Sequence, residues 1–327
     1  MRILVVGGAG YIGSHAVRAL LAAGHAVQVF DTLEYGHQAS VPSSMFTRGD
    51  LADRDALEAL LRDHQIETVM HFAAYASVPE SVAEPAKYYA NNVVGSLNLL
   101  EAMRAVGCRK IVFSSTAATY GVPDKSPIVE ETAKQPINPY GFTKLVVEHA
   151  LADYAAAYGF GFAVLRYFNA CGAASDASIG EDHTPETHLI PIILQVALGQ
   201  RENVAIFGTD YPTPDGTCIR DYIHVEDLAN AHILALERIE LGKGMTYNVG
   251  TGKGFSVREV VESCRRVTGR EITAVEKPRR AGDPPELVAS SVAIRRDLGW
   301  SPKFTEIDAI VKSAWAWHLS NPNGYNG

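Results

Sequence analysis

The sequence has little cysteine and no long apolar run. Its four cysteines, at positions 108, 171, 218 and 264, form no Cys-x-x-Cys pair among the 327 residues. This pattern argues against a disulfide scaffold, and we expect reduced thiols and a cytoplasmic protein. The most apolar later stretch, residues 189–198, is interrupted by Pro191 and Gln195 and is too short to span a bilayer.

Positive charge is also scarce. The chain has 29 lysines and arginines against 37 aspartates and glutamates, which gives a formal net charge of −8. We therefore expect no nucleic-acid partner and no anionic membrane partner, because both call for a basic surface. A small basic site for one anionic ligand is still compatible with this balance. The composition, 47% hydrophobic and 20% charged, excludes intrinsic disorder.

Short apolar runs alternate with helical patterns through the first half of the chain. The patterns predict strands at 2–6, 26–30, 68–73, 110–115 and 162–167, and helices at 12–23, 53–64, 88–105 and 140–158. Strands that alternate with helices require crossover connections, so the sequence predicts an α/β fold with a doubly wound parallel sheet of the Rossmann type.

The first predicted strand runs into the glycine-rich turn GGAGYIG at residues 7–13. Glycines here allow a tight turn and let backbone N–H groups approach a pyrophosphate at the start of a helix. Asp31 ends the second predicted strand eighteen residues after Gly13, where a carboxylate can accept hydrogen bonds from both ribose hydroxyls. The two residues after Asp31 supply no arginine for a 2′-phosphate, so we expect NAD rather than NADP.

The pattern changes after about residue 170, where loops with proline and glycine separate shorter elements. A helix at 225–238 and a strand at 245–249 still resemble the first half. We therefore expect an NAD-binding Rossmann domain at 1–170, to which 223–250 returns. Residues 171–222 and 251–327 are expected to form mainly a smaller, interleaved α/β substrate-binding domain.

A tyrosine and a lysine four residues apart begin the helix predicted at 140–158. Tyr140 and Lys144 would share one helix face, and an ammonium beside a phenol favours the phenolate and lowers the pKa of the tyrosine. A phenolate of near-neutral pKa is an efficient general base. Taken alone, the Tyr-x-x-x-Lys spacing is as easily a surface pair. Thr116, at the end of a hydroxyl-rich strand, can hydrogen-bond the same substrate oxygen, and together the three residues favour a catalytic group.

With these motifs the chain resembles the extended short-chain dehydrogenase/reductases and, within them, the UDP-glucose (UDP-galactose) 4-epimerase family. The motifs that carry the resemblance are GGAGYIG, GDLAD (49–53), HFAA (71–74), YYANNVVG (88–95), SSTAATYG (114–121), NPYGFTK (138–144), LRYFNACG (165–172), HLIP (188–191), IRDYIHVEDLA (219–229) and RRAGDPPELVASS (279–291). The last two are typical of the sugar-nucleotide branch.

The resemblance implies a role for each matching residue. Catalysis would fall to Tyr140, Lys144 and Thr116. The tightly bound NAD would contact Gly7, Gly10, Tyr11, Ile12, Gly13, Asp31, Asp50, Leu51, Phe72, Ala73, Asn91, Tyr140, Lys144 and Tyr167. The UDP-sugar would contact Thr116, Asn169, Leu189, Phe207, Arg220, Arg280 and Asp283. A guanidinium binds phosphate oxygens in a bidentate manner, which suits the two arginines.

The resemblance also implies an activity, the interconversion of UDP-glucose and UDP-galactose by C4 epimerisation through a transient 4-keto sugar, and a homodimer. Epimerisation of another UDP-sugar, such as UDP-N-acetylglucosamine or UDP-xylose, is the nearest alternative. Leu287 lies where the family is thought to gate N-acetyl groups, and Ala76 and His188 replace a lysine and an asparagine of some members.

Three other functions remain as alternatives. A 4,6-dehydratase of this branch would carry Asp-Glu after the threonine, where this chain has Ala117 and Ala118, and the glutamate of a related decarboxylase is missing too. A non-catalytic NAD(H)-binding or sugar-nucleotide-binding protein would have no need for the tyrosine, lysine and threonine. A metal site at residues 181–183 with His188 is unfavoured, because its i, i+5 histidine spacing does not suit one helix face, and we expect no metal.

Overall fold

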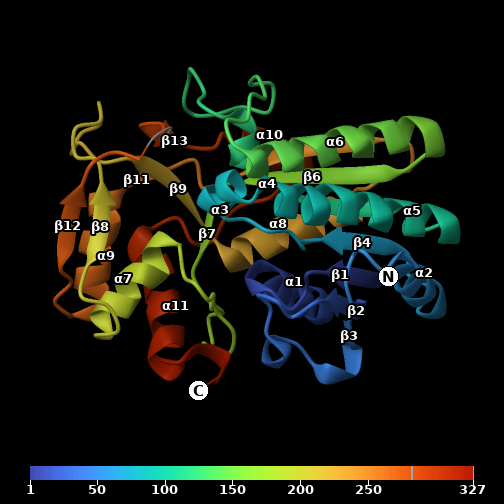
Figure 1. Ribbon diagram of the computed structural model, residues 1–327, viewed down its shortest axis with the longest axis horizontal. Helices are drawn as coiled ribbons and strands as arrows, with labels where there is room; N and C mark the ends of the chain where they lie inside the picture. The colour runs from blue at the N-terminus through green and yellow to red at the C-terminus, as the bar shows by residue number, and fades with distance from the viewer. Residues whose placement is uncertain (281–282, 327) are drawn as a thin grey trace.

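A seven-stranded parallel sheet forms the larger of two lobes in the computed structural model, which describes residues 1–280 and 283–326 (Figure 1). Its strand order is β10-β6-β5-β4-β1-β2-β3. The strands are β1 (Arg2–Val6), β2 (Ala26–Asp31), β3 (Phe46–Arg48), β4 (Thr68–His71), β5 (Lys110–Thr116), β6 (Gly161–Tyr167) and β10 (Gly244–Val249). The predicted doubly wound sheet of the Rossmann type is confirmed.

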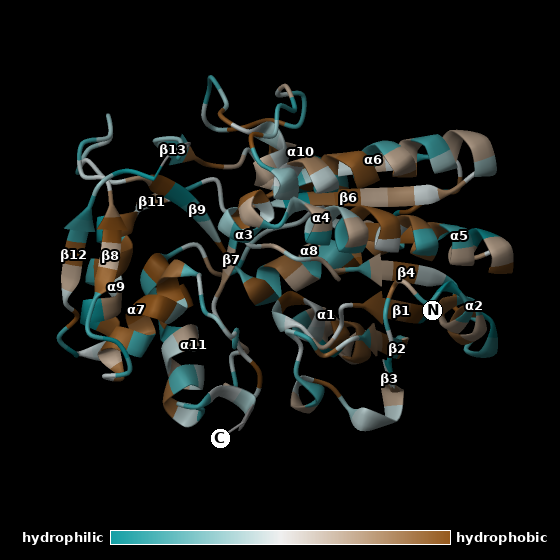
Figure 2. Ribbon diagram, in the orientation of Figure 1, coloured by the Kyte–Doolittle hydropathy of each residue, from teal (hydrophilic) through white to brown (hydrophobic). Residues whose placement is uncertain are grey.

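Helices cover both faces of this sheet. On one face lie α1 (Tyr11–Ala22), α8 (Val225–Glu237) and α10 (Val292–Leu298), and on the other α2 (Arg54–Asp63), α5 (Ser96–Val106) and α6 (Pro139–Tyr158). Successive side chains of a strand point to opposite faces, so Ile3 packs with the first set and Leu4 with the second. Burial on both faces explains why these strands read as apolar runs, which are brown in Figure 2.

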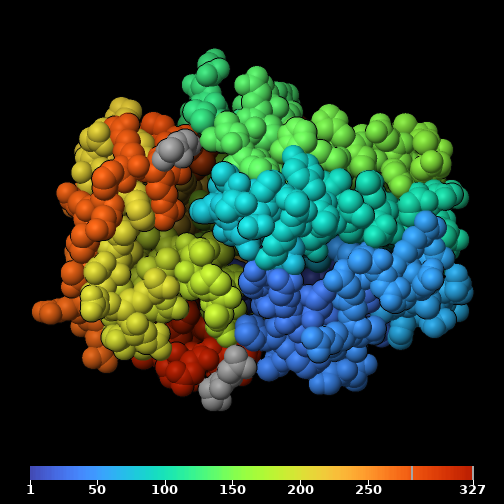
Figure 3. Space-filling view, viewed as in Figure 1, coloured from blue at the N-terminus to red at the C-terminus, as the bar shows by residue number. Residues whose placement is uncertain are grey.

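The smaller lobe is built from short strands and three helices. Its sheet joins β7 (Asn169–Cys171), β9 (Ile219–His224), β11 (Gly254–Ser256) and β13 (Glu286–Leu287), while β8 (Val204–Phe207) pairs with β12 (Ala274–Lys277). Helices α7 (Leu189–Ala197), α9 (Val257–Thr268) and α11 (Ile307–Ser320) share a separate apolar core, which includes Ile193, Val260 and Ile310. The space-filling view shows this lobe, in yellow to red, beside the larger one (Figure 3).

The sequence missed two features of the larger lobe. Strand β3 is only three residues long at the sheet edge, and no apolar run marks it. The helix predicted at 88–105 is broken into α4 (Pro85–Tyr88), a π-helical turn η3 (Tyr89–Gly95) and α5. A π-helical turn keeps a helical pattern in the sequence, so apolar spacing alone does not reveal it.

The chain passes repeatedly between the lobes. After α9 and β12 it returns to the larger lobe, where Ile294, Leu298 and Trp300 are buried against the sheet core. The four cysteines are buried and unpaired by disulfides. Within the residues that the structure describes, no helix is both long and apolar enough to cross a membrane.

Candidate active site

A cavity of about 380 Å³ opens at the carboxyl ends of the strands of the larger sheet. Strand order reverses around β1, which lies between β2 and β4, and ligands of doubly wound sheets bind at such a reversal. All fourteen residues predicted to contact the cofactor line this cavity: Gly7, Gly10, Tyr11, Ile12, Gly13, Asp31, Asp50, Leu51, Phe72, Ala73, Asn91, Tyr140, Lys144 and Tyr167. Thr116 and Asn169 line it as well.

Three of the four glycines of the turn differ in the room that the chain leaves around them. Gly7 has φ +76°, and a Cβ there would lie 2.4 Å from the backbone nitrogen of Ala73. A Cβ on Gly13 would lie 2.1 Å from the carbonyl oxygen of Gly7, so helix α1 packs on the turn with no room for a side chain. A Cβ on Gly10 would meet nothing closer than 3.5 Å. Packing within the chain therefore leaves room at Gly10, and its bare backbone faces the cavity.

The start of α1 suits an anion. Gly10 precedes the helix with no side-chain cap, and the first N–H groups of a helix have no partner within it. These groups and the helix dipole favour a phosphate. The glycine turn at this uncapped helix start therefore fits the pyrophosphate of a dinucleotide.

Asp31 is held in place by the backbone at the end of β2. Its Oδ2 accepts a hydrogen bond from the N–H of Ala9 at 3.0 Å, and its Oδ1 accepts one from the N–H of Leu33 at 2.9 Å. Burial raises the pKa of Asp31, and these hydrogen bonds oppose the rise. Each carboxylate oxygen keeps a further lone pair, so the aspartate can still accept both hydroxyls of a ribose. The residues present therefore fit NAD.

Local sequence fixes the start of α6, where the predicted catalytic pair lies. The Asn138 side chain caps the helix by accepting from the N–H of Gly141 at 2.8 Å, and Pro139 occupies the first turn. A Cβ on Gly141 would lie 2.5 Å from the carbonyl oxygen of Ala118. The helix therefore packs directly on η4 (Ala117–Tyr120), which follows β5.

Tyr140, Lys144 and Thr116 are all buried and line the same cavity. Burial raises the pKa of Tyr140, and a hydrogen bond with Thr116 lowers it in part. Lys144 is not among the groups that shift the pKa of Tyr140 in this arrangement, so the lowering expected from the sequence is not observed. The Lys144 Nζ instead donates to the carbonyl oxygen of Ser114 at 2.8 Å. Burial lowers the pKa of Lys144 to about 7, although the Glu148 carboxylate opposes the shift, so its own positive charge is weakened.

The residues predicted for the UDP-sugar divide into two groups. Thr116 and Asn169 line the cavity, and the Asn169 Nδ2 donates to the carbonyl oxygen of Asp221 at 3.0 Å. The other predicted contacts, which belong to the smaller lobe, do not line it: Leu189, Phe207, Arg220, Arg280 and Asp283.

Those outer residues contact one another in pairs. The Arg220 Nη2 lies 3.6 Å from Oδ1 of Asp283, while its Nη1 donates to two backbone carbonyl oxygens. The Arg280 guanidinium lies over the Phe207 ring, 3.9 Å from its centroid. Leu287 pairs with Arg220 across β13 and β9. Both guanidiniums thus contact partners within the chain. A bound diphosphate would have to replace these partners.

Sequence reasoning missed part of the cavity lining. Glu34, Tyr35 and Tyr75 line it, and the Tyr75 hydroxyl donates to Glu34 at 2.6 Å. The Lys87 Nζ lies 4.0 Å from the centroid of the Tyr75 ring. Glu34 and Tyr35 follow the end of β2, and Tyr75 follows the end of β4. Ligand contacts gather at such strand ends, so their position was the signal available in the sequence.

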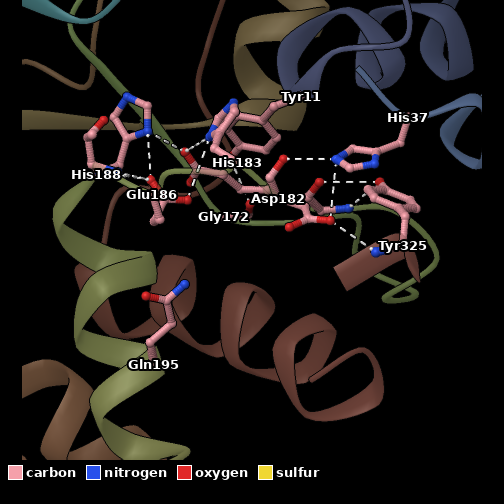
Figure 4. A network of polar contacts seen from close by, with 12 residues as sticks. Tyr11, His37, Gly172, Asp182, His183, Glu186, His188, Gln195 and Tyr325 are labelled. Carbon is pink, nitrogen blue, oxygen red and sulfur yellow. Dashed lines mark hydrogen bonds and ion pairs between the residues drawn. The ribbon is translucent and has the colours of Figure 1, made fainter. Parts of the chain in front are cut away.

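The loop before α7 also reaches the cavity, through Glu181, His183 and His188. Figure 4 shows the side chains of His183 and His188 with Glu186. The argument against a metal assumed a helix, whereas these residues lie in a loop, so helix-face spacing does not apply to them. Burial lowers the pKa of His183, but the carboxylates of Glu181 and Glu186 outweigh it and raise that pKa to about 9.

Comparison with known proteins gives one consistent result. Residues 3–250 match the model of the NAD dependent epimerase/dehydratase family. The chain is 54% identical over 327 residues to the UDP-glucose 4-epimerase of Halalkalibacterium halodurans, covering 100% of this chain and 98% of that protein.

Two solved structures show the same similarity. UDP-glucose 4-epimerase from Brucella ovis in complex with NAD is 48% identical with a TM-score of 0.93, and the match covers 96% of this chain and 97% of that one. UDP-glucose 4-epimerase from Bifidobacterium longum in complex with NAD⁺ and UDP is 37% identical with a TM-score of 0.94, over 99% of this chain and 100% of that one.

Proposed function

The chain belongs to the NAD dependent epimerase/dehydratase family, and from that premise we propose that it interconverts UDP-glucose and UDP-galactose by inverting C4. It is an NAD-dependent isomerase. The observation that carries the proposal is the buried group of Tyr140, Lys144 and Thr116 on the cavity whose glycine turn and Asp31 fit NAD. NAD held there would supply the hydride acceptor, and afterwards the hydride donor, for the sugar C4.

Tyr140 moves the proton. Its phenolic oxygen takes the proton of the sugar 4-hydroxyl as C4 is oxidised, and it returns that proton when C4 is reduced. Its hydrogen bond with Thr116 orients the oxygen and lets the threonine hydroxyl share the same substrate oxygen. General acid–base catalysis of this kind contributes about 10²–10⁴-fold to the rate.

Lys144 sets the charge around that proton transfer. Its pKa of about 7 lets the side chain carry a positive charge part of the time near neutrality. Whenever it is protonated, an ammonium one helical turn from the phenol favours the phenolate. Its hydrogen bond to Ser114 fixes the side chain against β5.

The substrate would be held mainly by its UDP portion. We assign this role to Asn169, Leu189, Phe207, Arg220, Arg280 and Asp283. An anchor on the diphosphate leaves the 4-keto sugar free to rotate and present its other face. Arg220 and Arg280 supply the positive charge that a diphosphate requires, on a chain whose net charge is −8.

The cavity disfavours a dehydratase. Ala117 and Ala118 form the start of η4, directly after Thr116, where a dehydratase would need an acid and a base. Methyl groups cannot move a proton to or from the sugar 6-hydroxyl, so elimination of water has no catalyst at this position.

We also propose the wider organisation. Residues 1–170 and 223–250 would form the NAD-binding domain, and 171–222 and 251–327 mainly the UDP-sugar domain. Exposed apolar side chains on helices of the NAD domain, including Val82, Val94 and Phe142, support a homodimer formed through those helices. The buried free cysteines are consistent with a cytoplasmic protein. Light scattering on the purified protein tests the dimer.

Product analysis tests the activity. The purified protein is incubated separately with UDP-glucose, UDP-N-acetylglucosamine and UDP-xylose, and the products are identified by NMR. We expect UDP-galactose from UDP-glucose, and no net consumption of NAD. The other two substrates report whether Leu287 admits an N-acetyl group or a pentose. A 4-keto-6-deoxy product would replace the epimerase proposal with a dehydratase.

A further inference from the structure

Four potential metal ligands converge in the loop between β7 and α7. They are Glu181, His183, Glu186 and His188, and one donor atom from each lies within 4.8 Å of all the others. Figure 4 shows the imidazoles of His183 and His188 close to the Glu186 carboxylate. The catalytic proposal uses none of these four side chains.

The distances between the donor atoms match a small coordination shell. His188 Nδ1 lies 2.8 Å from Glu181 Oε1 and 3.3 Å from Glu186 Oε1. His183 Nδ1 lies 3.5 Å from Glu181 Oε1 and 3.6 Å from Glu186 Oε2. Four ligands at ~2.0–2.1 Å around a tetrahedral Zn²⁺ lie about 3.3 Å from one another, which falls inside the observed range.

Two of these atoms have ion-pair contacts within the cluster but no contact with hydrogen-bond geometry among the described residues. Glu181 is 96% buried, since its side chain is 4% exposed, and its Oε1 accepts no hydrogen bond from the described part of the chain. Within the same residues the Nδ1 of His183 is also unpartnered. Both atoms face the centre of the cluster, because each has close contacts with the other donors. A buried carboxylate oxygen left without a hydrogen bond is costly unless something else occupies its lone pairs.

We propose that these four side chains bind one divalent cation of the Zn²⁺ type. Two imidazole nitrogens and two carboxylate oxygens are ligands that Zn²⁺ accepts, whereas Mg²⁺ and Ca²⁺ prefer oxygen alone. With neutral imidazoles the two carboxylates carry the two negative charges that one divalent ion balances. Four protein ligands leave no position for a reacting water, so the site is structural.

The surroundings support the ligands. The backbone N–H groups of Thr187 and His188 donate to Glu186 Oε1 at 2.7 and 2.8 Å, which fixes that carboxylate. The Tyr11 ring packs edge-on against His183 at 6.2 Å. Tyr11 belongs to the first turn of α1, so the proposed cation site lies beside the predicted cofactor site.

The competing interpretation is a cluster of ion pairs without a cation. It needs both imidazoles protonated. Burial opposes this state, but the neighbouring carboxylates outweigh burial and favour it, because they raise the pKa of both histidines. It would leave the Glu181 oxygen and the His183 nitrogen with contacts that lack hydrogen-bond geometry. The two interpretations differ in one measurable respect, the affinity for added Zn²⁺.

Zinc binding to the full chain with its bound nucleotide provides the test. The protein is stripped with a chelator, reloaded with Zn²⁺, desalted and analysed for metal by mass spectrometry. We expect one Zn²⁺ per chain, and an affinity at least about 100-fold lower in His183→Gln and in Glu186→Gln, because each removes one ligand. Asp182→Asn is the matched control, since this carboxylate belongs to the same loop but pairs with His37 at 3.3 Å. It should keep the zinc.

A second probe makes the test independent of folding. Co²⁺ loaded in place of Zn²⁺ should give the strong visible absorption of a tetrahedral site in the wild type and in Asp182→Asn. Variants that keep wild-type circular dichroism but lose this absorption would support the proposal. It is overturned if the wild type retains no Zn²⁺ after desalting, or if folded His183→Gln and Glu186→Gln bind Zn²⁺ as tightly as the wild type.

Discussion

The cofactor half and the substrate half of the site differ in how closely their predicted residues gather around one cavity. Every residue predicted to contact NAD lines one cavity, and these residues lie on strand ends, helix starts and the glycine turn. Five of the residues predicted to contact the UDP-sugar lie off that cavity, where Arg220 pairs with Asp283 and Arg280 covers Phe207.

The difference follows from what holds each half. Backbone contacts fix the cofactor half, as between Gly13 and Gly7 or between Gly141 and Ala118. Because the backbone is closely packed at these points, the geometry of this half has little freedom to change. Side-chain pairs at the mouth of the smaller lobe hold the substrate half, and long side chains exchange partners at little cost. The cofactor half is therefore the more rigid part of the site, and the substrate half the more adjustable.

The sharpest test of the cofactor half separates chemistry from binding. Tyr140→Phe removes only the hydroxyl, so we expect turnover of UDP-glucose to fall by about 10²–10⁴-fold. The bound nucleotide should stay, because the ring still lines the cavity. Absorbance of the purified variant reports the nucleotide, and a coupled assay reports turnover. Wild-type turnover would contradict the role of this tyrosine.

A second test asks whether the glycine turn is fixed by backbone contacts. Gly13→Ala places a methyl group 2.1 Å from the Gly7 carbonyl oxygen, so we expect NAD affinity to fall by about 100-fold, the scale of ~3 kcal/mol of overpacking. Gly10→Ala is the control for folding, since its nearest neighbour lies at 3.5 Å. Retention of NAD through gel filtration compares the NAD affinity of the two variants. If Gly13→Ala lowered thermal stability no more than Gly10→Ala, backbone contacts would not be what fixes the glycine turn.

A third test uses the buried lysine of the cofactor half. Because burial lowers the pKa of Lys144 to about 7, the unfolded chain binds the proton more tightly than the folded chain between about pH 7 and 10. Stability from this group therefore rises with pH in that window, by ~2 kcal/mol from about pH 7 to 9. Denaturant unfolding of wild type and Lys144→Met, compared at the two pH values, should show the rise only in the wild type.

The smallest effect is expected at the mouth of the smaller lobe. Arg220→Ala should raise KM for UDP-glucose by about tenfold with little change in kcat, because the arginine binds the diphosphate equally in ground state and transition state. Arg279→Ala is the matched control, since its guanidinium pairs with Asp210 at an exposed position. Steady-state kinetics decides. A fall in kcat at Arg220 would mean that this residue also positions the sugar.

The sequence predicted the strands, the glycine turn and the residues that line the cavity of the larger lobe for a physical reason. Apolar runs, a glycine turn and a strand-end aspartate are local signals. The structure has strands, a turn and a cavity-lining carboxylate near the positions that these signals predict. The raised pKa of Tyr140 was not predictable, because it depends on burial and on the direction in which Lys144 points. Nor was the meeting of Glu181, His183, Glu186 and His188, since loop geometry brings them together.

The return of the chain to the larger lobe limits how such proteins can be recombined. The family match ends at residue 250, yet Ile294, Leu298 and Trp300 fill the core beneath the sheet that the match describes. A truncation or a single-point fusion after residue 250 would expose that core. Modular exchange of the smaller lobe therefore needs several junctions at once, and substrate preference is more easily altered by point changes at positions such as Leu287.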